Sequence, residues 1–183
     1  MTIIFANHGD VDCATIARMW NGVEGINLVE ITPNEDEFAS EIRVDNAIAA
    51  EEDTLLLIGH GTTDGLLHPN FRGSYLIHEN NIDLIRARRV ICCWCYASTF
   101  CEAHDFHAFA TSMFISNVGE TYDNCIYGVE QESIDATNIR IYSEIMQLMQ
   151  SETPLNEWVM IMGARMDAEN PVDCFNRQGL LYS

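Results

Sequence analysis

Short runs of apolar residues alternate along the chain with segments whose apolar positions repeat at the spacing of a helix face. The apolar runs at residues 54–58 and 89–95 are continuous, which is typical of strands buried on both faces of a parallel sheet. Strands that alternate with helices define an α/β domain with a mainly parallel central sheet flanked by helices. The predicted strands cover residues 2–7, 26–32, 54–58, 89–95 and 113–118, and the predicted helices cover residues 10–23, 34–53, 101–112, 132–150 and 155–170.

No internal repeat or convincing linker interrupts this pattern, so we expect residues 1–183 to form one domain. Between the third and fourth predicted strands lie about thirty residues, enough for a hairpin-like excursion and a crossover helix.

Two of the apolar runs end at residues whose side chains can take part in catalysis. One ends at His60-Gly61 in "LLLIGHGTTDG", and the other ends at Cys95 in "RRVICCWCYAS". Ligands of open parallel sheets bind at the carboxyl ends of the strands. If the two strands are neighbours, His60 and Cys95 will face one crevice.

Composition narrows the function classes. The chain carries 28 Asp and Glu against 9 Lys and Arg, a formal net charge of −19. A field of this sign repels nucleic acid and anionic membrane surfaces and is compatible with a basic substrate or partner. No window is long and apolar enough to span a bilayer, and the start, "MTIIFANHGD", lacks a cationic signal region. With seven cysteines and no secretory signal, we expect free thiols and a cytoplasmic protein.

A cysteine and a histidine together form a nucleophile and its base. An imidazole can lower the pKa of a nearby thiol, accept its proton and later protonate a leaving amine. Gly61 lets the backbone approach a substrate, and its N–H and that of Cys95 are candidates for an oxyanion hole. Taken alone, His60 is as well explained as a structural histidine and Cys95 as a buried thiol. Their matching positions favour catalysis that needs no cofactor.

These two motifs resemble those of the caspase-like cysteine peptidases of clan CD, which include caspases, metacaspases, legumain, clostripain and CHAT domains. In that family an apolar strand ends in His-Gly, and a later apolar strand ends in the nucleophilic cysteine. The resemblance covers roughly residues 1–150 and implies a three-layer sandwich and a thiol protease. It makes His60 the general base and acid, Cys95 the nucleophile and Gly61 part of the oxyanion hole.

The sequence departs from the family pattern beside the nucleophile. Trp94 stands where the family usually has Ala or Ser, and Tyr96 follows in place of Arg. The alternative is therefore a catalytically inactive caspase-like interaction module with a protein partner. A competent pair predicts a reactive Cys95 of low pKa, and an inactive module predicts an inert one.

The substrate expected of an active enzyme is a polypeptide, with control through a regulatory protein partner. Arginines that would bind an acidic P1 residue are scarce, whereas carboxylates occur in loops that could line the pocket. Asp10, Glu120 and Asp123 are the candidates for substrate binding, and they favour a basic P1 residue through charge pairing.

Two further interpretations remain open. Cys95, Cys101, His104 and His107 lie close in sequence and could bind zinc, although their spacing is not that of a standard site. The "IIFANHGD" and "LLLIGHGTT" stretches faintly resemble the two His-Gly motifs of histidine phosphatases. Asn7 then stands where that family has arginine, and the acidic chain disfavours an anionic substrate.

Overall fold

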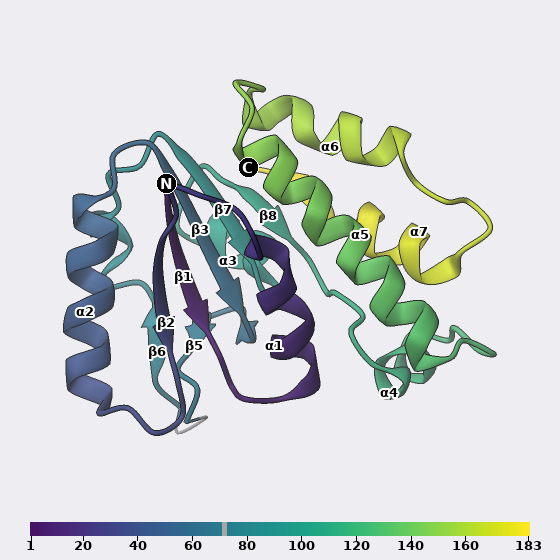
Figure 1. Ribbon diagram of the computed structural model, residues 1–183, viewed down its shortest axis with the longest axis horizontal. Helices are drawn as coiled ribbons and strands as arrows, with labels where there is room; N and C mark the ends of the chain where they lie inside the picture. Colours follow the sequence, from purple (N-terminus) through teal and green to yellow (C-terminus); the bar gives the residue numbers. More distant parts are fainter. Residues whose placement is uncertain (71–72) are drawn as a thin grey trace.

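The structure, a computed structural model, describes residues 1–70 and 73–183 (Figure 1). Its centre is a six-stranded sheet with the strand order β2-β1-β3-β7-β8-β9, in which β9 runs antiparallel to β8 and the other neighbours are parallel. The strands are β1 Thr2–Ala6, β2 Asn27–Ile31, β3 Thr54–Gly59, β7 Arg89–Cys93, β8 Phe109–Thr111 and β9 Leu180–Tyr182.

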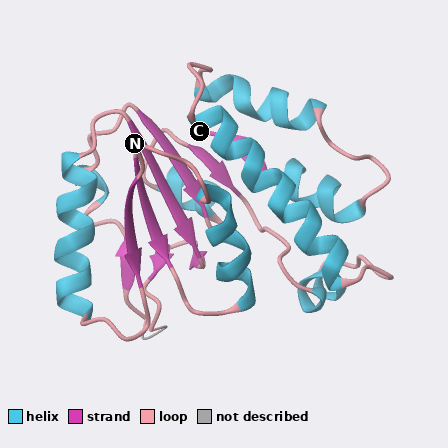
Figure 2. Ribbon diagram, in the orientation of Figure 1, coloured by secondary structure: helices cyan, strands magenta, loops and turns pink. Residues whose placement is uncertain are grey.

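Helices cover both faces of this sheet, so the described chain forms a three-layer α/β sandwich (Figures 1 and 2). One face packs against α1, α5 and α6, and the other packs against α2, α3 and a small second sheet. The α-helices are α1 Val11–Ile16, α2 Glu37–Ala50, α3 Ala97–Ala103, α4 Val118–Asp123, α5 Gln131–Met149, α6 Leu155–Ala164 and α7 Pro171–Gln178. A 3-10 helix, η1 Ala17–Trp20, continues α1.

The central strands show why their sequences contain no polar alternation. All five residues of β1 are buried, and Ile3 and Phe5 face one core while Ile4 faces the other. In β3, Leu56 joins the first core and Leu55 the second. Each buried side chain of this size stabilises the fold by about 1.5–3 kcal/mol relative to an exposed one.

The connection from β3 to β7 differs from the prediction. It contains no α-helix in its described part; it forms a three-stranded antiparallel sheet and a 3-10 helix. Glycines at the strand ends and the short apolar pairs favour hairpins over a helix in this segment. Its elements are β4 Gly61–Thr62, β5 Gly65–Leu67, β6 Tyr75–Ile77 and η2 Ile82–Leu84.

The prediction of a strand at residues 113–118 was wrong, and so was a helix through residue 112. The strand in this region is β8, which ends at Thr111, before the predicted one begins. Ile115 lies in a loop whose backbone bonds to side chains: its N–H donates to Asn176 Oδ1 at 2.7 Å, and its carbonyl accepts from Asn138 and Asn176. These amides satisfy the buried backbone that a strand neighbour would otherwise satisfy. The place next to β8 belongs to β9, which was not predicted.

Among the described residues, no helix is both long and apolar enough to cross a membrane.

Candidate active site

The candidate site is a pocket at the carboxyl end of the parallel sheet. In the register of the strands, Ala6 of β1 pairs with Gly59 of β3, and Ile58 pairs with Cys93 of β7. These three strands therefore end at one level, and their loops emerge together. The pocket is lined by α1, by the segments that follow β3, β7 and β8, and by α5; its side chains include those of Asp12, His60, Cys95, Phe114, Ser116 and Tyr142. The expected convergence of His60 and Cys95 in one crevice is thus what the structure contains.

Asp10, which the sequence analysis assigned to substrate binding, contacts the histidine. Its Oδ2 atom lies 2.7 Å from Nε2 of His60, and its Oδ1 atom accepts the Cys13 N–H at 2.8 Å, capping α1. Burial alone would raise the pKa of Asp10, but the Cys13 amide and His60 hold that pKa below its usual value. A charged carboxylate thus fixes the orientation of the His60 ring.

His8 is a second histidine at this site, and its ring meets that of His60 edge to face at a centroid distance of 4.8 Å. Its Nδ1 atom lies 3.1 Å from the Ala6 carbonyl oxygen. Burial, followed by the proximity of His60, lowers the pKa of His8 to about 4. His8 is therefore neutral at neutral pH.

Cys95 follows β7 and is partly buried, with Sγ 3.9 Å from the Phe114 carbonyl oxygen. Burial raises the pKa of the Cys95 thiol, and the charges of Glu120 and Asp12 raise it further. A low pKa was predicted for a competent pair and an inert thiol for an inactive module; the raised pKa agrees with the second, because the nearest charges are negative and desolvation disfavours the thiolate.

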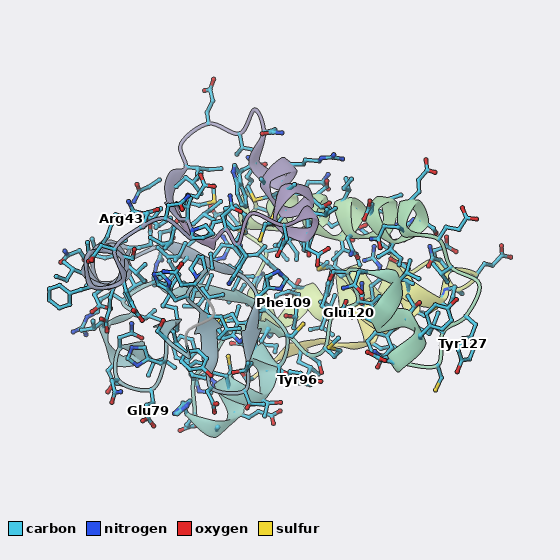
Figure 3. All side chains as sticks on the ribbon, turned by 90° about the horizontal axis from the view of Figure 1, so that it is seen from below. Arg43, Glu79, Tyr96, Phe109, Glu120 and Tyr127 are labelled. Carbon is cyan, nitrogen blue, oxygen red and sulfur yellow. The ribbon has the colours of Figure 1, made fainter. Side chains whose placement is uncertain are left out.

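The chain turns sharply after Cys95. Tyr96 has a φ of 68°, in the left-handed region, and its N–H donates to the Ser112 carbonyl at 3.2 Å. A bulky residue in this conformation is strained. Tyr96 is 44% exposed and precedes α3 (Figure 3). The turn holds Cys95 at the rim of the sheet.

Gly61 and Trp94 are in close contact, so the size of one residue limits the size of the other. A Cβ atom on Gly61 would lie 2.1 Å from Cδ1 of Trp94, whose Nε1–H donates to the Thr62 carbonyl at 3.1 Å. Gly61 therefore gives the Trp94 ring the space it occupies, a packing role that the sequence analysis did not foresee. Among the described residues that line the pocket, Gly59 is present and Gly61 is not. The bulky Trp94, which departs from the family pattern, is thus accommodated because residue 61 is a glycine.

One wall of the pocket is acidic. Asp12 Oδ2 accepts the Ser116 hydroxyl at 2.8 Å, and burial raises the pKa of Asp12, with the charges of Asp10 and Glu120 adding to the effect. Asp12 lies in the pocket lining and was not predicted, although its position two residues after Asp10 in the first turn of α1 was a usable signal.

The other two predicted carboxylates are placed differently. Glu120 forms a capping box at the start of α4 with Asn117, whose N–H it accepts at 3.3 Å; its Oε2 atom also accepts the Ser116 N–H at 2.6 Å and the Ser116 hydroxyl at 3.0 Å (Figure 3). It therefore acts on the pocket through Ser116 and through its charge. Asp123, at the other end of α4, is exposed and outside the described pocket lining.

The zinc ligands suggested by sequence do not gather. Cys101 is buried within α3, and the ring of His104 packs on Phe100 at 4.7 Å. In the part of the chain that the structure describes, the clusters with metal-ligand spacing lie elsewhere, around His60. They are His8, Cys13 and His60, and Asp10, Asp12 and His60.

Comparisons with protein-family models, with curated proteins and with solved structures found no match for this chain. A proposal for the function therefore rests on the geometry of the pocket.

Proposed function

We propose that the protein is a caspase-like cysteine peptidase in which Cys95 is the nucleophile and His60 the general base and acid. The observation that carries the proposal is the pocket that both side chains line, at the ends of adjacent parallel strands, with Asp10 bound to His60. The order of strands and helices up to α3 also agrees with the order that the family resemblance implies. All seven cysteines are free thiols, which supports a cytoplasmic location.

In the proposed mechanism, Cys95 rests as a thiol because its pKa is raised. His60 takes the thiol proton as Sγ attacks the scissile carbonyl carbon. Since Nε2 faces Asp10, the nitrogen that receives this proton is Nδ1. The imidazolium is stabilised by Asp10 and then protonates the leaving amine, and water, deprotonated by His60, hydrolyses the acyl-enzyme.

The preferred P1 side chain in this proposal is basic. Asp12 is a partly buried carboxylate in the pocket lining, with Glu120 behind Ser116, and no cation is paired with Asp12 among the described ion pairs. An arginine or lysine side chain beside Asp12 would form a charge-assisted hydrogen bond there. Its positive charge would also lower the pKa of Cys95, so that a correct substrate favours its own cleavage.

Two alternatives stand beside this proposal, and the raised pKa of Cys95 is what the first of them, an inactive interaction module, predicts. An inactive interaction module was suggested by Trp94, but Gly61 accommodates that side chain without closing the pocket at His60 and Cys95. Phosphatase activity gains from the contact between His8 and His60, yet the adjacent Asp10 and Asp12 carboxylates would repel a phosphoryl group.

The deciding experiment is cleavage of a fluorogenic peptide library with varied P1 residues. Wild type, Cys95→Ala and His60→Ala are compared with Cys125→Ala, which removes an exposed thiol outside the pocket lining. We expect cleavage after Arg or Lys by wild type and Cys125→Ala, and none by the other two variants. Cleavage that survives Cys95→Ala would refute the assignment of the nucleophile. No cleavage by folded wild type would favour the interaction module.

A further inference from the structure

We infer that His8, Cys13 and His60 form a binding site for a thiophilic divalent metal ion such as Zn²⁺. The structure brings one potential ligand atom of each residue to within 4.8 Å of the others. His8 and Cys13 come from the loop after β1 and from α1, and His60 follows β3. The site therefore depends on the pairing of β1 with β3.

The donor set selects the class of metal. One thiolate and two imidazoles are the ligands of zinc and of the later first-row metals, whereas calcium and magnesium require oxygen ligands. Three protein ligands leave the fourth position of a tetrahedral ion for water. When the ion binds, the Cys13 S–H bond breaks, the sulfur forms a bond to the metal, and the proton leaves to solvent.

Both imidazoles already have the supporting contacts of metal-bound histidines. A histidine ligand commonly holds its second ring nitrogen against a carbonyl or carboxylate oxygen, which fixes the ring. His8 Nδ1 lies 3.1 Å from the Ala6 carbonyl oxygen, and His60 Nε2 lies 2.7 Å from Asp10 Oδ2. The Cys13 thiol donates to the same Ala6 carbonyl at 3.7 Å, a bond that is lost when the sulfur binds the metal, and Sγ accepts the His8 N–H at 3.2 Å, which supports a thiolate. The cluster is therefore compact around one backbone carbonyl.

Charge and access favour a cation at this position. The Asp10 and Asp12 carboxylates lie beside His60, and the whole chain carries a net charge of −19. Cys13 is buried, but the side chains of His60 and Asp10 are 29% and 41% exposed. An ion can thus reach the cluster from the His60 side.

The site shares His60 with the candidate dyad but does not include Cys95. A metal ion bound there would prevent His60 from accepting the thiol proton, so occupancy would inhibit cleavage; this consequence rests on the proposed function. The metal site itself does not, because it is defined by ligands alone.

The test is a titration of the full, metal-stripped and reduced protein with Co²⁺, followed by displacement with Zn²⁺ in competition with a chromophoric chelator. We expect one Co²⁺ per chain, with a thiolate-to-cobalt charge-transfer band and the visible bands of tetrahedral cobalt. Zn²⁺ should displace the cobalt and abolish both. The absence of a charge-transfer band would overturn the site, because it would show that no thiol binds the ion.

Variants assign the ligands. His8→Gln and Cys13→Ser should each weaken Zn²⁺ binding by more than the roughly 10- to 100-fold that outer-shell changes cost, and Asp10→Asn should weaken it by about that amount. Cys125→Ser controls for the loss of a thiol and should bind as wild type. Because Cys13 is buried, circular dichroism must confirm its fold, and His8→Gln gives an independent result if that variant unfolds.

The remaining variants separate this inference from the rival explanations. Cys95→Ala should abolish cleavage and retain metal binding; loss of binding would place the ion on the dyad instead and overturn the site. Binding that depends on Asp12 and not on Cys13 would assign the ion to the neighbouring cluster of Asp10, Asp12 and His60. If the protein cleaves no peptide but Cys13-dependent binding persists, the metal site stands and only the proposed function fails.

Discussion

The carboxylate of Asp10 joins helix α1 to the candidate catalytic histidine: one oxygen accepts the Cys13 N–H at 2.8 Å, and the other lies 2.7 Å from His60 Nε2. Because the helix fixes the carboxylate, the His60 ring is held in one orientation. A side chain expected to bind substrate thus contacts the candidate general base instead.

We expect Asp10→Asn to lower kcat by roughly 10²- to 10⁴-fold with little change in KM, because the amide no longer stabilises the imidazolium or fixes its tautomer. Asparagine caps helices as well as aspartate does, so α1 should remain folded. Asp36→Asn, at the corresponding position before α2, is the matched control. Steady-state kinetics with one peptide decides; equal losses in both variants would contradict the role of Asp10.

Asp12→Asn should reduce the preference for P1 arginine over the isosteric, neutral citrulline. A charge-assisted hydrogen bond is worth about 1.5–3 kcal/mol, so the ratio of kcat/KM values should fall by about 10- to 100-fold. Asp123→Asn makes the same charge change on an exposed residue outside the described pocket lining and should leave the ratio unchanged. An effect of Asp123→Asn as large as that of Asp12→Asn would point to a general field instead.

The raised pKa of Cys95 makes its reactivity dependent on pH. At neutral pH iodoacetamide should label Cys95 more slowly than the exposed Cys125, and the rate at Cys95 should rise as the pH increases through and above 9, as thiolate forms. Asp12→Asn removes a negative charge that opposes the thiolate, so it should lower the pKa and speed labelling. Peptide mass spectrometry measures each site; faster labelling of Cys95 than of Cys125 at neutral pH would indicate a preformed thiolate.

Gly61→Ala should destabilise the fold, because its Cβ atom would lie 2.1 Å from the buried Trp94 ring. Overpacking of this kind typically costs about 1–3 kcal/mol in the free energy of unfolding. Gly163→Ala, within α6 and with no atom within 4 Å of the new Cβ, should stabilise by roughly 0.5–1 kcal/mol. Urea unfolding measures the free energy of unfolding of both variants. If this free energy is unchanged in Gly61→Ala, the Trp94 ring moves to make room for the new Cβ atom.

The buried strands were predictable because each sequence is a continuous run without charged or polar side chains after its first residue. β1, β3 and β7 are buried on both faces, so their residues do not alternate between apolar and polar. The segment around Ile115 is also apolar, yet it forms a loop, because Asn138 and Asn176 bind its backbone. Those amides are 23 and 61 residues away in sequence, so no local pattern contains them.

The placement of His60 and Cys95 in one pocket could be predicted from sequence because each follows a strong strand, and parallel strands end at a common edge. The roles of Asp10 and Asp12 could not be assigned in this way. Both follow β1, and only the turn into α1 decides that one faces His60 while the other enters the pocket.

The sequence by itself determined the alternation of strands and helices, the buried parallel sheet, the acidic charge, and the sheet edge at which His60 and Cys95 line one pocket. These follow from local hydrophobicity and from the geometry shared by all parallel sheets. Only the tertiary structure decided the partners of each side chain: Asp10 with His60, Gly61 with Trp94, and His8 and Cys13 beside the same histidine. Such pairings depend on strand order and on side-chain directions within a few ångströms, which residues distant in sequence set together.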